Sequence, residues 1–332
     1  MNPVLSIRDL RIEFETFEGP AQVLDGIHLT LRKSETLGLV GETGCGKSIT
    51  AKAILRLLPI PPARIPSGEI LFNGRDLLKM SDEEIKEIRG RHIAMVFQDP
   101  MTFLNPVFTI EEQLIDVLLA HTDREIPEKR MDRKEAKKRA IELLREVRIP
   151  QPELRIKSYP HEFSGGMRQR VLIAMALSRS PQILIADEPT TALDVTIQAQ
   201  ILKLLKDLVD QYGHSVLLIS HDLGVVSKVC KRIAVMYAGN IVEDCSTREL
   251  FRNPLHPYTR GLLSSILTFK ERKQEAQGIP GVLPDLIHPP SGCRFHPRCR
   301  EAMKICEWKK PPMIEIEIGH WVSCHLYQNP FL

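Results

Sequence analysis

The chain has 332 residues, more than one typical domain, so a main domain with a smaller addition is the first expectation. Hydrophobic residues make up 43% of the chain and charged residues 26%, a composition typical of a globular protein in water. The formal net charge of +3 is too small to make nucleic acid or an anionic lipid surface its main partner.

The sequence carries no pattern of an export or membrane segment. Its first residues, MNPVLS, lack the basic stretch and the apolar core of a secretory signal. No apolar run approaches the roughly 20 residues that span a bilayer. We therefore expect a cytoplasmic protein that contacts a membrane only through other proteins.

The N-terminal part predicts an antiparallel sheet followed by a strand, a loop and a helix. Residues 4–31 contain stretches that alternate apolar and polar side chains, the period of half-solvated strands. Residues 36–40 form a continuous apolar strand, and residues 48–58 have the 3.6-residue apolar period of a helix. Four prolines between positions 59 and 66 then break the chain before an edge strand at residues 68–72.

The middle of the chain alternates strands and helices. Apolar strands are expected at residues 93–97, 183–186 and 215–219, with a helix near 196–208 between the last two. From about residue 99 to 165 the pattern is mainly helical and strongly charged, which suggests an inserted helical subdomain. Strands that alternate with helices imply a parallel sheet in an α/β core.

The composition of the sequence changes at about Asn253. Prolines crowd the remaining stretch, which also holds four of the seven cysteines. We therefore divide the chain into a main domain of residues 1–252 and a small, loop-rich C-terminal domain of residues 253–332.

The loop at residues 41–48 reads GETGCGKS and fits the P-loop pattern G-x-x-x-x-G-K-[ST]. In this pattern backbone N–H groups close around the β-phosphate of a nucleotide, while the lysine and the serine reach the terminal phosphates and Mg²⁺. The sequence therefore predicts that the protein binds and hydrolyses ATP. The residues expected at the phosphate site are Gly41, Glu42, Thr43, Gly44, Cys45, Gly46, Lys47, Ser48 and Ile49.

Two adjacent acids follow the predicted strand at residues 183–186. Asp187 is placed to hold Mg²⁺ through its water shell, and Glu188 to orient and polarise the attacking water. A merely structural pair of acids at a strand end would carry weight only if the P-loop were missing.

A second anion site is expected at Ser164-Gly165-Gly166, which precedes an apolar helix at residues 171–178. A helix N-terminus offers free N–H groups and the positive end of the helix dipole. Because the P-loop already serves one nucleotide, we expect this site to serve a nucleotide held by another subunit. The alternative is an ordinary turn before a helix.

With these motifs in this order, the chain resembles the ATP-binding subunits of ABC transporters, and Ser164-Gly165-Gly166 matches that family's signature motif. The family usually has Leu before the serine and Gln after the glycines, where this chain has Phe163 and Met167. The family's ligand contacts come mainly from the serine and the glycine backbone, so the role is retained. The expected fold is an α/β P-loop NTPase (RecA-like) core with an N-terminal antiparallel β-subdomain, an inserted α-helical subdomain and a small C-terminal Cys-rich domain.

The resemblance also implies roles for residues outside these motifs. Gln98 resembles the Q-loop residue that senses Mg²⁺ and the attacking water, and Ala192-Leu193-Asp194 resembles the D-loop that crosses the dimer interface. His221, after the strand at 215–219, resembles the switch histidine that contacts the γ-phosphate. An aromatic residue of the N-terminal sheet stacks on adenine in this family. Phe14 and Phe17 compete for that role, and Phe17 is favoured because it precedes a turn.

Four cysteines, Cys293, Cys299, Cys306 and Cys324, lie within a short region that has little apolar material for a core of its own. In a reducing cytoplasm disulfides are not expected, which leaves zinc or an iron–sulfur cluster, both served by four thiolates. The common zinc spacing C-x₂-C is absent, and unrelated free thiols remain an alternative. Cys45, Cys230 and Cys245 are scattered and are expected to be ordinary buried or loop residues.

Two C-terminal segments narrow the resemblance. Residues 253–259 (NPLHPYT) and 291–299 (SGCRFHPRC) resemble those of the dipeptide/oligopeptide subfamily of importers, which also includes nickel importers. In that subfamily the cysteine set is associated with a [4Fe–4S] cluster, which favours iron–sulfur over Zn²⁺ here. The resemblance implies an ATPase that energises import of di- and oligopeptides.

Three other functions compete with this reading: a nickel or other small-solute importer, a soluble ABC ATPase that acts on DNA or ribosomes, and a non-enzymatic regulatory partner. The soluble class usually carries a coiled-coil insertion or two cassettes, and the sequence shows neither. A regulatory partner would be expected to lack Glu188 or His221, and both are present.

The resemblance finally implies partners and a place in the cell. The partners are two transmembrane permease subunits and a second ATP-binding subunit, either a related paralogue or another copy of this chain. A peptide-binding protein would act indirectly, and nucleic acid is not expected. The implied location is the cytoplasmic face of the cell membrane.

Overall fold

The computed structural model describes residues 3–120, 131–191, 193–267 and 279–328. The chain divides into two compact units: the first joins residues 1–79 to residues 218–332, and the second comprises residues 80–217. Across the described residues, no helix has both the length and the apolar character that crossing a bilayer requires.

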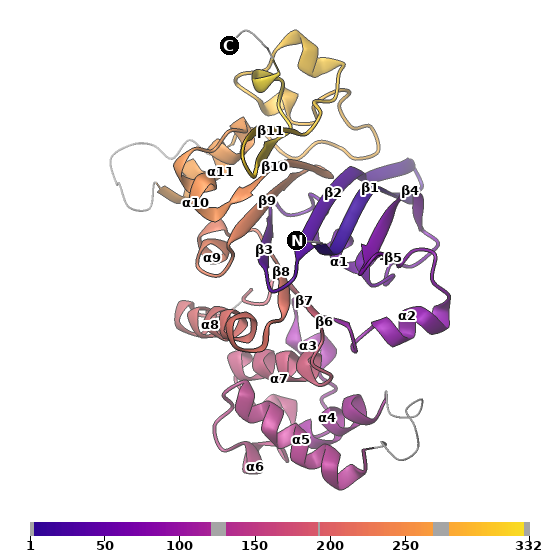
Figure 1. Ribbon diagram of the computed structural model, residues 1–332, viewed down its shortest axis with the longest axis vertical. Helices are drawn as coiled ribbons and strands as arrows, with labels where there is room; N and C mark the ends of the chain where they lie inside the picture. The colour runs from indigo at the N-terminus through magenta and orange to yellow at the C-terminus, as the bar shows by residue number, and fades with distance from the viewer. Residues whose placement is uncertain (1–2, 121–130, 192, 268–278, 329–332) are drawn as a thin grey trace. The chain divides into compact units, whose positions relative to one another are not determined.

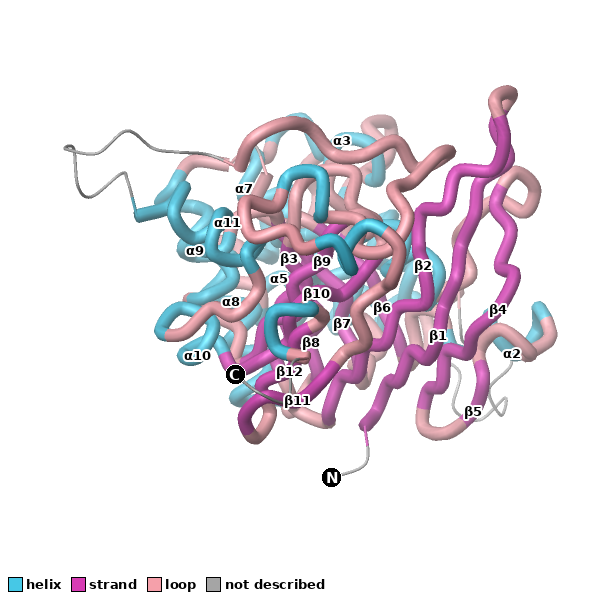
Figure 2. Tube along the Cα trace, turned by 90° about the horizontal axis from the view of Figure 1, so that it is seen from above, coloured by secondary structure: helices cyan, strands magenta, loops and turns pink. Residues whose placement is uncertain are grey.

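The first unit contains a four-stranded antiparallel sheet in the order β2-β1-β4-β5, whose long strands lie side by side in Figure 2. The pairing of the first two strands confirms the predicted N-terminal antiparallel sheet. The strands are β1 (Pro3–Thr16), β2 (Gly19–Arg32), β4 (Ala63–Phe72) and β5 (Arg75–Asp76).

The structure corrects the edge strand that the sequence predicts at residues 68–72. The observed strand β4 begins at Ala63 and lies between β1 and β5. Pro66 stands inside it, between the paired positions Arg64 and Ser67, where the register against β1 shifts. Proline lacks an N–H donor, and an irregularity in the ladder is where a strand tolerates that loss.

A second sheet of the first unit follows the order β11-β12-β10-β9-β3-β8. Strand β3 pairs parallel with β9, whereas β10 pairs antiparallel with both β9 and β12. The C-terminal part therefore extends this sheet with a hairpin, seen beside β10 in Figure 1. The strands are β3 (Thr36–Val40), β8 (Ser215–Ser220, where the boundary with the second unit falls), β9 (Arg232–Tyr237), β10 (Asn240–Ser246), β11 (Ile314–Glu317) and β12 (His320–Val322).

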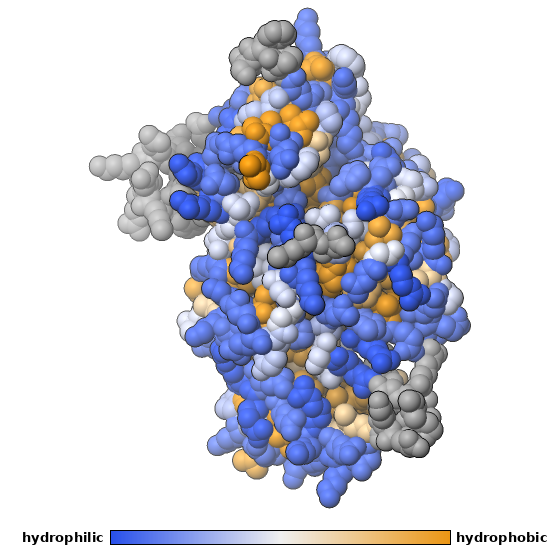
Figure 3. Space-filling model, in the orientation of Figure 1, coloured by the Kyte–Doolittle hydropathy of each residue, from blue (hydrophilic) through white to orange (hydrophobic). Residues whose placement is uncertain are grey.

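Helices of the first unit flank this sheet. Helix α1 was expected to reach residue 58 but ends at Ile54, because Arg56 adopts a left-handed φ of 49° that no helix continues through. Apolar side chains gather on the face of the hairpin β11–β12 (Figure 3), where Ile316 and Ile318 are exposed. The helices are α1 (Lys47–Ile54), α9 (Leu223–Ser227), α10 (Thr247–Arg252) and α11 (Pro257–Leu267), with the short 3-10 turns η3 (His296–Arg298), η4 (Lys304–Glu307) and η5 (His325–Tyr327).

The second unit pairs two parallel strands, β6 (Ile93–Val96) and β7 (Ile183–Asp187), close to their predicted positions. The described elements between positions 100 and 162 are all helical, and α4, α5 and α7 pack on one another. The helices are α2 (Asp82–Ile88), α3 (Pro100–Phe103), α4 (Ile110–Leu119), α5 (Arg133–Glu146), α6 (Pro152–Arg155), η2 (Pro160–Glu162), α7 (Gly165–Leu177) and α8 (Val195–Tyr212).

Candidate functional site

The phosphate loop connects β3 to α1 in the first unit, and its glycines are required by its shape. Gly46, the N-cap of α1, has a φ of 111°, and a Cβ there would lie 2.7 Å from Leu24 Cδ2. Gly44 has a φ of 87°. Both values lie in the left-handed region that glycine adopts without strain. Because a glycine has no side chain to cap the helix, the first amide groups of α1 are available to an anion.

Lys47 is buried, and its ammonium lies among carbonyl groups of the same loop. Nζ donates to Gly41 O and to Glu42 O, each at 2.8 Å. Cys45 is fully buried beside it, and burial raises the pKa of its thiol, so this cysteine is inert at neutral pH. The loop therefore brings a positive charge and backbone N–H groups together, as a polyphosphate site requires.

Two residues of the C-terminal part contact the phosphate loop, and the motifs did not indicate either of them. Tyr258 Oη accepts a hydrogen bond from Glu42 N–H at 2.9 Å. The guanidinium of Arg298 forms a double ion pair with the Glu42 carboxylate, with N–O distances of 2.8 and 3.0 Å. The P-loop pattern does not specify the residue at position 42, so it could not predict these contacts. The one signal in the sequence was that Tyr258 and Arg298 fall in the two segments typical of the importer subfamily.

Two further predicted residues lie in the first unit. Phe17 is fully exposed in the turn between β1 and β2, whereas Phe14 is half-buried within β1 and pairs with Ala21. An exposed ring is available for stacking on a base, and the preference for Phe17 over Phe14 stays a prediction. His221 is exposed in the connection from β8 to α9.

The predicted acids lie at the end of β7 in the second unit. Asp187 is buried, and Glu188 has a φ of 47°, a strained value for a residue other than glycine and one that functional sites often retain. The Glu188 carboxylate accepts hydrogen bonds from Gln98 Nε2 at 3.1 Å and from Thr191 Oγ1 at 3.0 Å. The structure thus brings together Gln98 and Glu188, which are far apart in the sequence.

The signature segment forms the start of α7, which begins at Gly165 and so includes the glycines in its first turn. Ser164 is the N-cap, and its hydroxyl accepts from Met167 N–H at 3.3 Å. A Cβ at Gly166 would lie 2.3 Å from Ile197 Cγ2, so only glycine lets α8 approach this closely. Helix α7 therefore begins at a close crossing with α8.

The residues of the expected D-loop lead into α8. Asp194 is the N-cap of that helix and accepts a hydrogen bond from Ile197 N–H at 2.9 Å. Leu193 packs near Gly165, with 3.3 Å between its Cδ2 and the position of a Cβ there. Ala192 lies outside the described residues.

The residues expected to hold Mg²⁺ offer suitable donors. A hydroxyl from Ser48, an amide oxygen from Gln98 and a carboxylate from Asp187 are the oxygen ligands that Mg²⁺ prefers. Ser48 belongs to the first unit, whereas the other two belong to the second.

The four C-terminal cysteines are free thiols, and they lie near enough for their charges to act on one another. Burial raises the pKa of Cys293 to about 11, and the charges of Cys306 and Cys299 add to this shift. Burial likewise raises the pKa of Cys324 to about 12, with contributions from all three other cysteines of the set. Without a cation the thiols of Cys293 and Cys324 are therefore protonated at neutral pH.

Main-chain groups favour the thiolate form at three of these cysteines. For Cys293, Cys299 and Cys324, a main-chain hydrogen bond from the residue two positions further along lowers the thiol pKa against the larger effect of burial. Donors of this kind accompany sulfurs that bind a metal or a cluster. The cysteine set therefore fits a metal centre by its chemistry.

The spacing of the sulfurs departs from a closed zinc site. Among the described residues, one group of His, Cys, Asp and Glu places three ligand atoms within 4.8 Å of one another, and it is Glu243, Cys245 and His320. Within the described part of the chain, no three of the C-terminal sulfurs form such a group. Tetrahedral zinc, with Zn–S bonds of about 2.3 Å, holds its sulfurs about 3.8 Å apart. In a four-iron cluster each thiolate binds a different iron atom.

The group of Glu243, Cys245 and His320 is a structural junction. Glu243 is fully buried, and its carboxylate accepts from Leu255 N–H at 2.8 Å, His256 N–H at 2.9 Å and His320 Nε2 at 2.8 Å. Burial opposes its ionisation, but the bond from His320 and the main-chain donors outweigh that effect and lower its pKa. Because both oxygens are already occupied, the carboxylate joins β10 to the residues just before α11 and to β12 rather than holding a cation.

Comparisons with known proteins agree with these motifs. Residues 24–191 match the family described as ABC transporter, and residues 242–306 match the family described as oligopeptide/dipeptide transporter, C-terminal region. The second match includes three of the four C-terminal cysteines, and Cys324 lies beyond it.

Curated relatives cover nearly the whole chain. The oligopeptide transport ATP-binding protein OppD of Bacillus subtilis (strain 168) is 50% identical over 97% of this chain and 88% of its own length. The dipeptide transport ATP-binding protein DppD of the same organism is 48% identical over 98% of this chain and 95% of its own length.

Among solved structures, the post-hydrolysis dimer of the ATP-binding cassette MJ0796 bound to ADP and phosphate has a TM-score of 0.64 and 28% identity. The match covers 74% of this chain and 99% of that one.

Proposed function

The chain belongs to the ABC transporter family of ATP-binding proteins, and from that premise we propose that it hydrolyses ATP to drive the import of di- and oligopeptides through a membrane transporter. Its ATPase chemistry follows from the family. The observation that carries the peptide assignment is the match of residues 242–306 to the oligopeptide/dipeptide C-terminal region, together with relatives named for peptide transport.

We assign the steps of hydrolysis to the motif residues. The loop amides and Lys47 bind the phosphates, while Ser48, Asp187 and Gln98 supply oxygen ligands for Mg²⁺. Glu188 orients the attacking water and accepts its proton, and Gln98 Nε2 at 3.1 Å from its carboxylate supports that carboxylate. His221 contacts the γ-phosphate, and Phe17 stacks on the adenine.

The start of α7 serves a nucleotide held by a second ATP-binding subunit. Ser164 offers its hydroxyl there, the main chain of Gly165 and Gly166 offers N–H groups, and Asp194 faces the same interface. The partner subunit is a related paralogue or another copy of this chain. Two permease subunits carry the peptide path, which places this chain at the inner face of the membrane, and a peptide-binding protein delivers the solute.

The cysteines Cys293, Cys299, Cys306 and Cys324 hold a [4Fe–4S] cluster rather than zinc. Their mutual proximity and the main-chain donors to three sulfurs support a metal centre, and the resemblance to the peptide importer subfamily favours the cluster over zinc. Bound metal would couple thiolate formation to the folding of residues 279–328. We assign the centre an architectural role.

Metal analysis tests the cluster. Protein purified without oxygen should contain iron and sulfide in about equal amounts, and Cys299→Ser should lose both while the protein still binds MgADP. Stoichiometric zinc without iron would replace the cluster by the zinc alternative, and four titratable thiols without metal would refute both.

ATP-dependent uptake of peptide tests the function. The chain, purified with its permeases and binding protein and placed in proteoliposomes, should take up a labelled dipeptide only when ATP is present. Glu188→Gln should abolish uptake while MgADP still binds. Uptake of ⁶³Ni²⁺ without peptide uptake would replace the peptide assignment by the nickel alternative.

A further inference from the structure

Arg298 uses all of its donor groups within the first unit, so its guanidinium is fixed. Nε donates to Pro280 O at 2.7 Å, and Nη2 donates to Gly281 O at 3.3 Å as well as to the carboxylate of Glu42. Nη1 donates to the other oxygen of Glu42 and to Tyr237 Oη at 3.3 Å. Only 8% of the Arg298 side chain is exposed. A long side chain held by this many partners no longer samples other rotamers.

Glu42 is held at three of its own groups. Its carboxylate binds Arg298, its N–H donates to Tyr258 Oη, and its carbonyl accepts from Lys47 Nζ. Tyr258 is fully buried and packs edge-on against Tyr237, with 4.7 Å between the ring centroids. The phosphate loop is therefore braced by side chains that lie more than two hundred positions away in the sequence.

The charge of Glu42 explains why this brace bears on nucleotide binding. A carboxylate in the phosphate loop repels the phosphates that the loop binds, unless a cation neutralises it. Arg298 supplies that cation through a bidentate pair, which also turns the carboxylate toward the C-terminal part.

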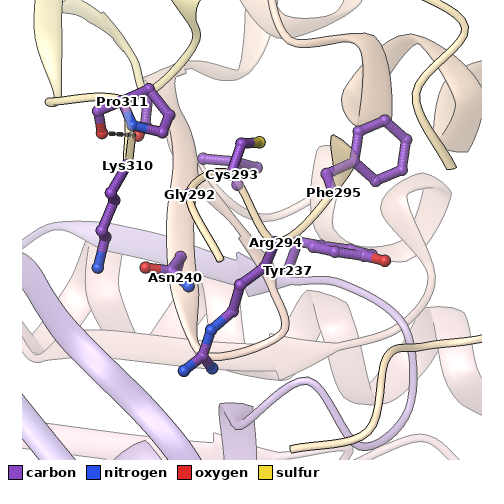
Figure 4. A pocket seen from close by; sticks show the side chains of 10 residues that line it. Tyr237, Asn240, Gly292, Cys293, Arg294, Phe295, Lys310 and Pro311 are labelled. Carbon is purple, nitrogen blue, oxygen red and sulfur yellow. Dashed lines mark hydrogen bonds between the residues drawn. The ribbon is translucent and has the colours of Figure 1, made fainter. Parts of the chain in front are cut away.

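The cysteine region is continuous with this brace. Arg298 ends the turn η3 and directly precedes Cys299, and the turn is closed by Arg298 N–H donating to Phe295 O at 3.0 Å and Cys299 N–H donating to His296 O at 3.1 Å. In the neighbouring stretch, Figure 4 shows the Cys293 sulfur and the guanidinium of Arg294 pointing in opposite directions.

Arg294 binds the same stretch to the ATP-binding core. It donates to Gln22 O at 2.9 Å and to Ala238 O at 2.8 Å, at the start of β2 and just after β9. The segment from 293 to 299 therefore carries two cysteines of the set together with two arginines that bind the ATP-binding core.

We propose that Arg298 is a positioning residue for nucleotide binding: it neutralises and fixes Glu42, and through it the cysteine region sets the conformation of the phosphate loop. The proposal rests on the proposed ATPase function and adds a regulatory connection to the same site. Anything that disorders the turn before Cys299 therefore weakens nucleotide binding at Lys47.

A double-mutant cycle with fluorescent mant-ADP and Mg²⁺ as the probe tests the proposal. Arg298→Gln should raise the Kd roughly tenfold, a factor that corresponds to about 1.4 kcal/mol. Glu42→Gln removes the repelling charge together with the need for its partner, so its own Kd is the reference for the double variant. The double variant Glu42→Gln/Arg298→Gln should match Glu42→Gln, because Arg298 acts through Glu42.

Two further variants serve as controls. Glu301→Gln breaks the exposed ion pair with Arg260 (2.9 Å) in the same C-terminal part and should leave the Kd unchanged. Arg298→Lys keeps the positive charge but cannot form the bidentate pair, so its Kd should lie between those of wild type and Arg298→Gln. It replaces Arg298→Gln in the test if that variant does not fold.

A third measurement tests the connection to the cysteines. Cys299→Ser should raise the Kd for mant-ADP in the wild-type background and raise it less in the Glu42→Gln background. An equal rise in both backgrounds would contradict the route through Glu42.

The outcomes separate this proposal from the proposed function. If the wild-type chain does not bind mant-ADP, or binds it no better than Lys47→Ala, the ATPase function itself fails. If wild type binds and Arg298→Gln binds equally well, or if its loss persists undiminished beside Glu42→Gln, the positioning role is refuted and the ATPase function stands.

Discussion

Helices α1 and α7 both begin with glycines at a predicted anion site, yet the two ends are built differently. At α1, Gly46 has a left-handed φ and no side chain to cap the helix, and the preceding loop is braced by the C-terminal part. At α7, Ser164 already caps the helix, and Gly166 is required by the close approach of α8. Glycine is needed at the start of α1 for its backbone conformation and at the start of α7 for close packing. In the proposed mechanism the first end holds the ligand of its own subunit, whereas the second, complete as a helix, offers its hydroxyl and dipole to a ligand brought by a partner.

The largest expected effect is on ATP turnover, and it comes from Glu188, which belongs to neither helix start. Glu188→Gln should lower the ATP turnover of the assembled transporter by roughly 10²–10⁴, the range for a lost general base, while MgADP affinity is kept. Thr191→Val, which removes one hydrogen bond to the same carboxylate, is the milder control. Turnover at the wild-type rate in Glu188→Gln would exclude this residue as the base.

Acid should weaken the support of the α1 loop. Burial lowers the pKa of His256 to about 4, and its Nδ1 accepts from Tyr258 N–H at 3.1 Å. The unfolded chain takes up this proton near pH 6.5 and the folded chain only near 4, so stability is lost as pH falls through that window. The full loss is about 3 kcal/mol.

The two tryptophans, Trp308 and Trp321, both lie in the C-terminal part and report on this loss by fluorescence. Carboxylates elsewhere in the chain titrate in the same window. The pH dependence of wild type is therefore compared with that of His256→Asn, whose side-chain oxygen replaces Nδ1 as the acceptor. An identical pH dependence in the two proteins would show that His256 does not titrate as described.

The packing role of the α7 glycines can be tested by adding a single methyl group. Gly166→Ala should lower the free energy of unfolding by about 1–3 kcal/mol, because its Cβ meets Ile197 at 2.3 Å. Gly165→Ala, whose Cβ would stand 3.3 Å from Leu193, should cost less than about 1 kcal/mol. Urea unfolding measures both, and equal losses would contradict the packing argument.

A smaller effect than that of Gly166→Ala is expected at the cap of α7. Ser164→Ala should lower the free energy of unfolding by about 1 kcal/mol, and Ser164→Thr should restore most of it. Both can be followed in the same urea titrations. A loss well above that of Gly166→Ala would mean that the cap, rather than the crossing with α8, holds this end of the helix.

The sequence predicts the parts of this protein whose signals are local. The apolar strands at 93–97 and 183–186 appear as β6 and β7, and the glycine-rich loop appears between β3 and α1. Helix α7 begins earlier than its apolar run, because Ser164 caps a first turn made of glycines that carry no hydrophobic period.

Contacts between distant positions could not be predicted in this way. The hairpin β11–β12 joins the sheet by pairing Glu243 with Val322, and Glu42 pairs with Arg298; neither contact has a signal in local periodicity. The closeness of Gln98 and Glu188 was expected only through the family resemblance. The division at residue 253 and the roles of the site residues stay predictions.

The specific ATPase activity of the purified chain, measured against its concentration together with its sedimentation, tests the central claim most directly. If the start of α7 must serve a nucleotide on another subunit, a monomeric chain is a poor ATPase. Activity per chain should then rise as dimers form, with itself or with an added second ATP-binding subunit, and Ser164→Ala should suppress the rise. High activity that is independent of concentration, in a chain shown to be monomeric, would contradict the account.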